Sequence, residues 1–164
     1  MSIVILTIGI PGAGKSTWVE NFTKKRRFTV ISTDEIRKEL TGVEQCVDPS
    51  QNEMIHDEAR KRVAKLINNP ENYGGNNGMG PAIIVDSTNV DVTEWLKYKE
   101  LRPRFLVAKV FDVTPEEAME HQKSRERQVP LDILKWKWDT LQENKKYLDK
   151  IFNFILGETD LPFT

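Results

Sequence analysis

Short apolar runs alternate along the chain with longer charged segments of helical periodicity. The runs are rich in β-branched residues, which is typical of buried strands. They occupy residues 3–9, 28–32, 81–86, 104–111 and 151–156. Strands that alternate with helices predict an α/β fold, in which a central, mostly parallel sheet carries helices on both faces.

Two helices can be placed from their apolar spacing. Within residues 50–68 apolar side chains recur at helical intervals, so one face of this helix should cover the sheet. They are Ile55, Ala59, Val63, Leu66 and Ile67. A long amphipathic helix begins at Leu131, and we expect its tryptophans to lie in the core rather than to stack on bases. Segment 68–81 is polar and rich in Asn and Gly, which predicts a loop, with a functional flap as the alternative.

Length and composition favour one domain spanning residues 1–164. The chain is 38% hydrophobic, which is enough for one ordinary core. It contains no run of eighteen apolar residues and begins with no export signal, so we expect a cytoplasmic protein without a membrane segment. Cys46 is the single cysteine, so no internal disulfide can form. The net charge of −1 argues against an extensive basic surface, and the clusters KKRR and ARKRVAK are interpreted as solvated helix faces.

The segment TIGIPGAGKSTW, residues 7–18, has the pattern G-x-x-x-x-G-K-[ST] between a strand and a helix. Glycines let backbone N–H groups approach an anion, and the helix N-terminus adds a favourable dipole. Lys15 can reach the β- and γ-phosphates of a nucleoside triphosphate, and the Ser16 hydroxyl can bind Mg²⁺. The expected nucleotide-binding residues are Gly12, Ala13, Gly14, Lys15, Ser16 and Thr17. The alternative is a glycine-rich turn that only connects strand to helix.

The second strand is followed by TDEIRKEL, which places Asp34 at the carboxyl end of a strand and Arg37 one helical turn later. Ligands of open α/β sheets bind at that end of the strands. A carboxylate there can accept a proton from an attacking hydroxyl, and an arginine can hold an anion. The alternative is structural, because Ser32 and Glu35 match a capping box in which Asp34 only favours the helix dipole.

Two further groups of polar residues follow later strands. Asp86 ends the third strand, and Thr88 stands just beyond it, where an acid can organise Mg²⁺ waters or the acceptor. An Asx-type turn before a helix explains the same residues equally well. Arg125 and Arg127 precede Pro130 in a connector that can close over a nucleotide and screen phosphoryl charge, unless they form a solvated helix end.

Taken together, these motifs resemble the 5′-kinase domain of polynucleotide kinases, especially the bacteriophage type. The similarity spans about residues 3–147 and rests on ILTIGIPGAGKSTW, STDEIRK, VDSTN, KVFDV and VPLDIL in that order. It implies a three-layer P-loop kinase fold that uses ATP and Mg²⁺ and phosphorylates the 5′-hydroxyl of DNA or RNA ends. In that resemblance Asp34 is the general base, Arg37 bridges toward the phosphates, and Arg125 is the lid arginine. Asp86, Thr88 and Val129 contact the acceptor.

The resemblance has departures, and other functions stay open. Thr33 stands where some relatives carry a basic residue, and either Arg125 or Arg127 can serve as the lid arginine. Phage relatives often continue into a phosphatase domain with an Asp-x-Asp motif, which this sequence lacks, so we expect it to leave 3′-phosphates alone. One alternative is a small-molecule or toxin-type kinase acting on a sugar or amino sugar. A second is a nucleotide-dependent binding switch, although no N-K-x-D guanine motif is present.

Overall fold

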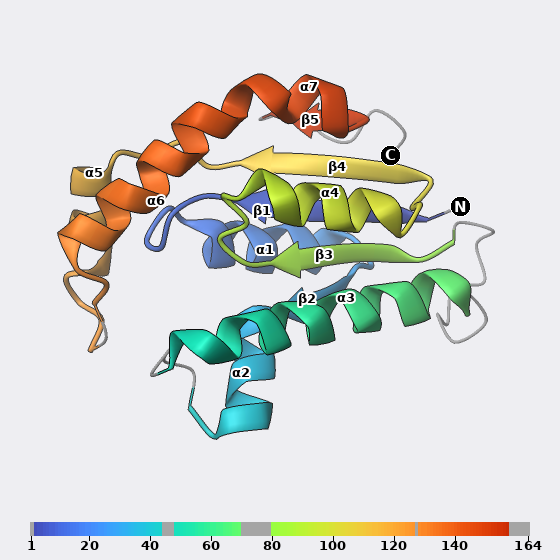
Figure 1. The fold of residues 1–164 in the computed structure, drawn as a ribbon, viewed down its shortest axis with the longest axis horizontal. Coiled ribbons are helices and arrows are strands. Elements are labelled where there is room, and N and C mark those ends of the chain that lie inside the picture. Colours follow the sequence, from blue (N-terminus) through green and yellow to red (C-terminus); the bar gives the residue numbers. More distant parts are fainter. Residues whose placement is uncertain (1, 44–47, 70–79, 127, 158–164) are drawn as a thin grey trace.

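The five apolar runs form the five strands of one parallel sheet. A computed structural model describes residues 2–43, 48–69, 80–126 and 128–157. Its strands are β1 (Ile3–Ile8), β2 (Thr29–Ser32), β3 (Ala82–Asp86), β4 (Phe105–Val110) and β5 (Phe154–Leu156). They lie in the order β2-β3-β1-β4-β5, and each neighbouring pair is parallel (Figure 1). The predicted α/β class is confirmed.

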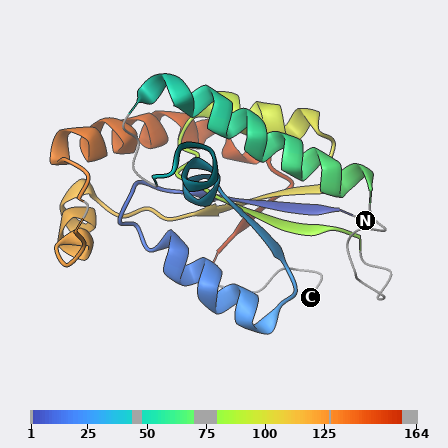
Figure 2. The same cartoon turned by 90° about the horizontal axis from the view of Figure 1, so that it is seen from below.

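Helices cover both faces of the sheet. They are α1 (Lys15–Lys25), α2 (Thr33–Thr41), α3 (Asn52–Asn68), α4 (Val92–Glu100), α5 (Pro115–Gln122), α6 (Leu131–Asn144) and α7 (Leu148–Ile151). Short 3₁₀ turns precede α3 and α7 at Pro49–Gln51 and Lys145–Tyr147. Figure 2 shows α3, α4 and α6 above the sheet and α1 below it, which confirms the three layers. None of the helices described here is long and apolar enough to cross a membrane.

The core follows from the alternation of side chains along the strands. In β1, Val4 and Leu6 belong to the cluster beneath α3 and α4, whereas Ile3 and Ile5 belong to the cluster beneath α1. The predicted face of α3 contributes Ile55, Ala59 and Val63 to the first cluster, and all three are fully buried. A buried strand with two covered faces explains why the run 3–9 is continuously apolar.

The tryptophans of α6 depart from the prediction. Leu134 is fully buried against the phosphate loop and α5, and Trp138, one helical turn later, packs at the edge of that small cluster. Trp136 is instead 67% exposed, so assigning it to the core was wrong. Residues two apart on a helix point to nearly opposite sides, so the contact of Leu134 with the core turns Trp136 away from it.

Some predictions concern residues outside the described ranges. These are the environment of Cys46, most of the loop 68–81, and the placement of Arg127.

Candidate active site

The phosphate loop joins β1 to α1 and has a backbone that requires glycine. Gly12 and Gly14 have φ angles of +84° and +93°, in the left-handed region that glycine adopts without strain. A Cβ at Gly12 would also lie 2.7 Å from the carbonyl oxygen of Ala118, so α5 fits against the loop only if residue 12 is glycine. A Cβ at Gly14 would meet no other part of the described chain within 4 Å, so the loop is open on that side.

Lys15 is held inside this loop. Its Nζ donates hydrogen bonds of 2.8 Å to the carbonyl oxygens of Gly9 and Ile10, and the residue is only 9% exposed. Burial lowers the pKa of Lys15 to about 8, and the nearby carboxylate of Asp86 opposes that shift. The ammonium group is therefore kept next to the loop that is expected to bind phosphate.

The segment that follows β3 is fastened to the base of the phosphate loop. Thr7 Oγ1 donates to the carbonyl oxygen of Ser87 at 3.0 Å, and Asn89 Nδ2 donates to the carbonyl oxygen of Thr7 at 3.0 Å. The Gly9 N–H donates to the carbonyl oxygen of Thr88 at 2.9 Å. Because these contacts are buried, Asp86 and Thr88 have fixed positions beside the loop.

Asp86 is not the residue that caps helix α4. The side chain that caps α4 is Asp91, whose carboxylate accepts from the Thr93 N–H at 2.9 Å. Burial raises the pKa of Asp86, while the ammonium group of Lys15 opposes that shift. Asp86 and Lys15 therefore form an electrostatically linked pair at the sheet edge.

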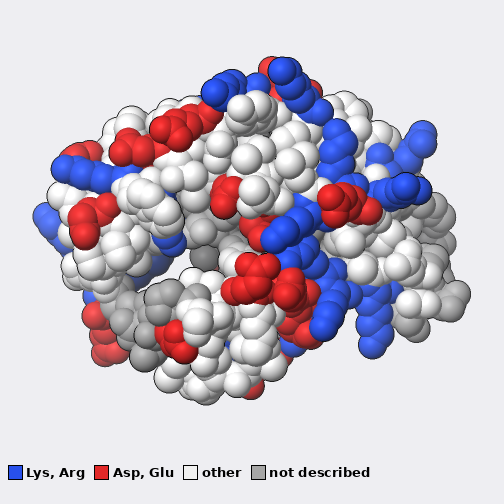
Figure 3. Space-filling model, in the orientation of Figure 1, with Lys and Arg blue, Asp and Glu red and all other residues white. Residues whose placement is uncertain are grey.

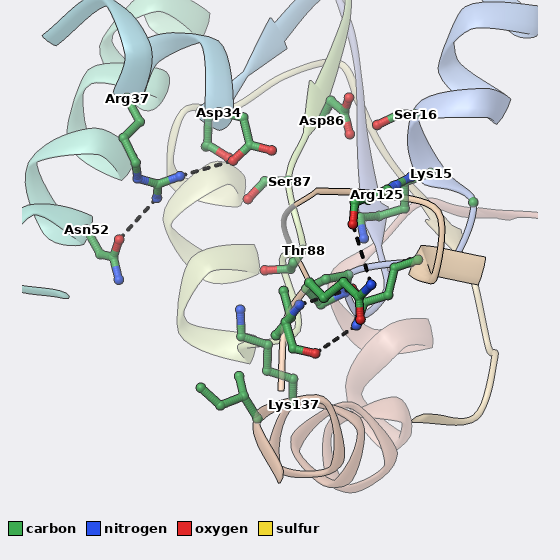
Figure 4. Close-up of a pocket in the computed structure, with 18 of the residues that line it drawn as sticks. Lys15, Ser16, Asp34, Arg37, Asn52, Asp86, Ser87, Thr88, Arg125 and Lys137 are labelled. Atoms are coloured by element: carbon green, nitrogen blue, oxygen red, sulfur yellow. Dashed lines mark hydrogen bonds and ion pairs between the residues drawn. The ribbon is translucent and has the colours of Figure 1, made fainter. Parts of the chain in front are cut away.

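On the other side, α2 presents Asp34 together with Arg37. Arg37 Nη1 donates to Asp34 Oδ1 at 3.0 Å, and Arg37 Nη2 donates to Asn52 Oδ1 at 3.1 Å (Figure 4). The Arg37 side chain is 10% exposed, whereas that of Asp34 is 65% exposed. Arg37 is thus fixed between two partners, and Asp34 is open to a ligand.

The capping alternative at α2 is also realised, by Ser32 as expected. Ser32 is the N-cap, and its Oγ accepts from the Glu35 N–H at 3.3 Å. Asp34 lies in the first turn, where an acidic residue favours the helix dipole as well. The structural and functional interpretations of Asp34 are therefore compatible.

The connector between α5 and α6 is anchored by a buried glutamine. Gln122 Nε2 donates to the carbonyl oxygen of Val129 at 2.7 Å, and the Val129 N–H donates to Gln122 Oε1 at 3.2 Å. Gln122 is 1% exposed. This pair of hydrogen bonds holds Val129 at the wall of the site.

Side chains from each of these segments border one cavity of about 660 Å³, within the usual size of small-molecule sites. Figure 3 shows it as a hollow between the side formed by α5 and α6 and the side formed by α2 and the start of α3. Most predicted site residues line it: Gly12, Gly14, Lys15, Ser16, Asp34, Arg37, Asp86, Thr88, Arg125 and Val129.

Ala13 and Thr17 do not line this cavity. Ala13 is buried against α5 and α6, so its side chain serves packing. Thr17 lines an adjoining cavity of about 500 Å³, together with Trp18, Asn21 and His121. Arg125 lines both cavities, as a group that closes over a nucleotide would.

Other residues of the large cavity were not anticipated from the sequence. They are Pro11, Thr33, Asn52, His56, Ser87, Gln122, Gln128, Pro130, Ile133, Trp136 and Lys137. Asn52 and His56 are four residues apart on α3, a spacing that places both on one face once the helix is known. Burial lowers the pKa of His56, which favours the neutral imidazole. Trp136 was assigned to the core in preference to a base-stacking role, and Lys137 carried no local signal for a site.

The oxygen atoms present suit Mg²⁺ bound together with a nucleotide. Within the described residues, no group of three or more His, Cys, Asp or Glu side chains forms a metal site. Ser16 and Asp86 line the same cavity (Figure 4). Mg²⁺ usually takes one or two protein oxygens and completes its shell with water and substrate phosphates, so these two residues fit the ion.

Comparison with known proteins places the chain in a family. Residues 4–146 match the family described as AAA domain. The chain belongs to the AAA domain family. This AAA domain also has the fold of solved structures that are less than 25% identical to it, among them several kinases, and these likenesses concern the fold alone.

Three of those structures illustrate the range of proteins that share this fold. A chain of the Pnkp1/Rnl/Hen1 RNA repair complex matches 99% of this AAA domain with a TM-score of 0.75 and 19% identity. The match covers 51% of that chain, so this sequence spans about half its length. A gluconokinase from Sinorhizobium meliloti 1021 matches 87% of this chain and 76% of its own, with a TM-score of 0.58 and 17% identity. Deoxyadenosine kinase from M. mycoides matches 98% of this chain and 93% of its own, with a TM-score of 0.53 and 18% identity. The AAA domain therefore has a P-loop kinase fold.

Proposed function

We propose that the chain is an ATP-dependent polynucleotide 5′-hydroxyl kinase. The observation that carries the proposal is the position of Asp34 and Arg37 on one wall of the cavity whose other wall is the phosphate loop with Lys15 and Ser16. A base for a hydroxyl and a cradle for a triphosphate then border the same space. That arrangement suits in-line transfer of the γ-phosphoryl group.

The chemistry assigns one task to each side chain. The Asp34 carboxylate accepts the proton of the acceptor 5′-hydroxyl, whose oxygen forms a bond to the γ-phosphorus while the bond to the β–γ bridging oxygen breaks and ADP leaves. Lys15 and Arg125 balance the negative charge that grows on the transferred group. Ser16, with help from Asp86, would hold Mg²⁺, which would supply further charge neutralisation.

Arg37 has a different task, because its guanidinium already supports Asp34. With Nη1 on Asp34 and Nη2 on Asn52, it faces the acceptor side in a fixed orientation. A fixed guanidinium is well suited to an anionic group such as the acceptor 3′-phosphate. Thr88 and Val129 provide one polar and one apolar contact for the acceptor nucleotide.

The adjoining cavity offers a place for the nucleobase of ATP. It opens beside the phosphate loop and is bordered by Trp18, Asn21 and Arg125. The donor would then bridge the two cavities over the loop, with Arg125 above it.

The similarity to the Pnkp1-containing RNA repair complex supports a nucleic-acid acceptor, since it covers 99% of this chain. The same fold in a gluconokinase and in a further sugar kinase supports the second candidate, a kinase of a small hydroxylated molecule. A binding switch without an acceptor has less support, because it leaves the Asp34–Arg37 pair without a task.

An acceptor panel tests the proposal. Labelled ATP is supplied with a 5′-hydroxyl oligonucleotide, the same oligonucleotide with a 5′-phosphate, gluconate, an amino sugar and deoxyadenosine. We expect label only on the 5′-hydroxyl oligonucleotide. Label on a sugar with the oligonucleotides inert would support the second candidate, and ATP binding with every acceptor inert would support the switch.

A further inference from the structure

One face of α6 lines the cavity, and two of its residues, Trp136 and Lys137, belong to no motif described above. Ile133, Trp136 and Lys137 all border the cavity. Their spacing of three and four residues places them side by side on one helix face. Leu134 and Leu141 of the same helix are fully buried, and Leu134, two residues before Trp136, points to nearly the opposite side from it, so the core fixes the register of α6.

This face is unusually apolar for an exposed one. Ile133 is 40% exposed and Trp136 is 67% exposed. Single exposed apolar residues are ordinary on protein surfaces, but an indole and an isoleucine adjacent on a cavity wall form a continuous apolar surface that faces a ligand. Trp136 is 67% exposed, so it contributes little to the hydrophobic core and most of its indole is available to a ligand.

Cations surround this apolar face. Lys137 follows Trp136 and extends from α6 into the cavity, and Arg125 lies in the connector that precedes the helix (Figure 4). Lys137 is also close enough to Lys15 for its charge to act on that residue. An aromatic surface flanked by cations is the combination that binds single-stranded nucleic acids, where bases stack on the rings and cations face the backbone.

We infer that Trp136 is a specificity-determining residue that stacks on a nucleobase of the acceptor strand, with Ile133 supporting the base and Lys137 facing the backbone phosphate. The inference rests on the proposed function and deepens it, because it makes a base, and not only a terminal hydroxyl and phosphate, part of the recognised substrate. A free sugar has no base to offer this surface.

The test compares acceptors that differ by one base. Steady-state transfer from ATP is measured with a 5′-hydroxyl oligonucleotide and with versions made abasic at the first, second or third position. The variants are Trp136→Ala, the conservative Trp136→Phe, and Leu96→Ala as a control at an apolar residue that is 45% exposed on α4, outside the cavity. Thermal unfolding of each variant checks that the fold is retained.

We expect Trp136→Ala to raise the KM for the intact oligonucleotide roughly 5- to 150-fold, the worth of one stacked base, and to leave the KM for ATP unchanged. Trp136→Phe should recover most of the affinity, and Leu96→Ala should behave as wild type. One abasic position should raise the KM of the wild type by a similar factor yet add nothing in Trp136→Ala, because both changes remove the same contact.

Two results would overturn the inference in different ways. If each abasic position raises the KM for the oligonucleotide by the same factor in the wild type and in Trp136→Ala, stacking on Trp136 is wrong and the kinase assignment survives. If the wild type does not phosphorylate any oligonucleotide, both the inference and the proposed function are wrong.

Discussion

Replacing Lys15 with methionine should change how stability depends on pH. In the folded chain, burial lowers the pKa of Lys15 from 10.5 to about 8. Between these two values the folded state binds fewer protons than the unfolded state. Unfolding then takes up a proton, so this residue makes the wild type more stable as the pH rises through that window.

The size of the effect follows from the shift. The difference in unfolding free energy between wild type and Lys15→Met should be nearly constant below pH 7, where the lysine is charged in both states. It should move in favour of the wild type by about 2 kcal/mol between about pH 7 and about pH 9.5. The hydrogen bonds that methionine cannot make to Gly9 and Ile10 shift the difference at every pH, so they do not alter its slope.

Urea unfolding of both proteins at the two pH values, without nucleotide or Mg²⁺, measures this change. Other titrating groups cancel in the difference, because both proteins contain them. A difference that stays constant, or that moves in favour of the variant, would show that the ammonium group is not buried in the loop. In the wild type, ATP affinity should also fall above about pH 8, because phosphate needs the charged lysine.

Three further predictions concern the acceptor and the lid. Asn52→Ala should raise the acceptor KM roughly tenfold with ATP binding unchanged, because it removes the partner that orients Arg37; an altered ATP KM instead would contradict this. Arg125→Ala should lower kcat more than ATP affinity, because its guanidinium meets charge that develops during transfer. If Arg127→Ala were inactive and Arg125→Ala normal, the lid arginine would be Arg127 instead. Acceptor binding should depend weakly on salt, with a log–log slope of roughly −1 to −2, and a much steeper slope would indicate an extensive basic groove.

The weak salt dependence expected for acceptor binding is consistent with how charge is arranged on the surface. Figure 3 shows Lys and Arg mixed with Asp and Glu over α3 and α4. Arg60 pairs with Glu94 at 2.6 Å, and Arg62 pairs with Glu39 at 2.6 Å. The two arginines of the ARKRVAK cluster are therefore committed to carboxylates, and Arg60, whose side chain is 12% exposed, is more buried than a solvated helix face implies.

The parts of the site that were predictable are those encoded by contiguous sequence. The order of strand, glycine loop and helix around Lys15 occurs within twelve residues, so no distant contact is needed to recognise it. Asp34 and Asp86 follow strands, and parallel strands bring their carboxyl ends to one edge; β2 and β3 are in fact paired, with Ser32 opposite Asp86.

The remaining site residues depend on contacts between distant elements. Asn52 joins the site only because α3 packs beside α2 and brings its amide to Arg37, fifteen residues away. Gln122 looks like any polar residue at a helix end until its hydrogen bonds to the Val129 backbone are seen. The orientation of Trp136 is set by which side of α6 meets the core, which periodicity did not resolve.

Whether the chain is a 5′-hydroxyl kinase with Asp34 as its base is decided by single-turnover phosphoryl transfer. Labelled ATP and a 5′-hydroxyl oligonucleotide are supplied to the wild type, Asp34→Asn and Glu35→Gln. Asp34 and Glu35 are neighbours in the first turn of α2, but only Asp34 lines the cavity. We expect labelled 5′ ends with the wild type, a transfer rate reduced roughly 10²- to 10⁴-fold by Asp34→Asn with ATP affinity unchanged, and a mild effect of Glu35→Gln. Unlabelled oligonucleotide with the wild type, or equal rates for the two variants, would contradict the proposed function.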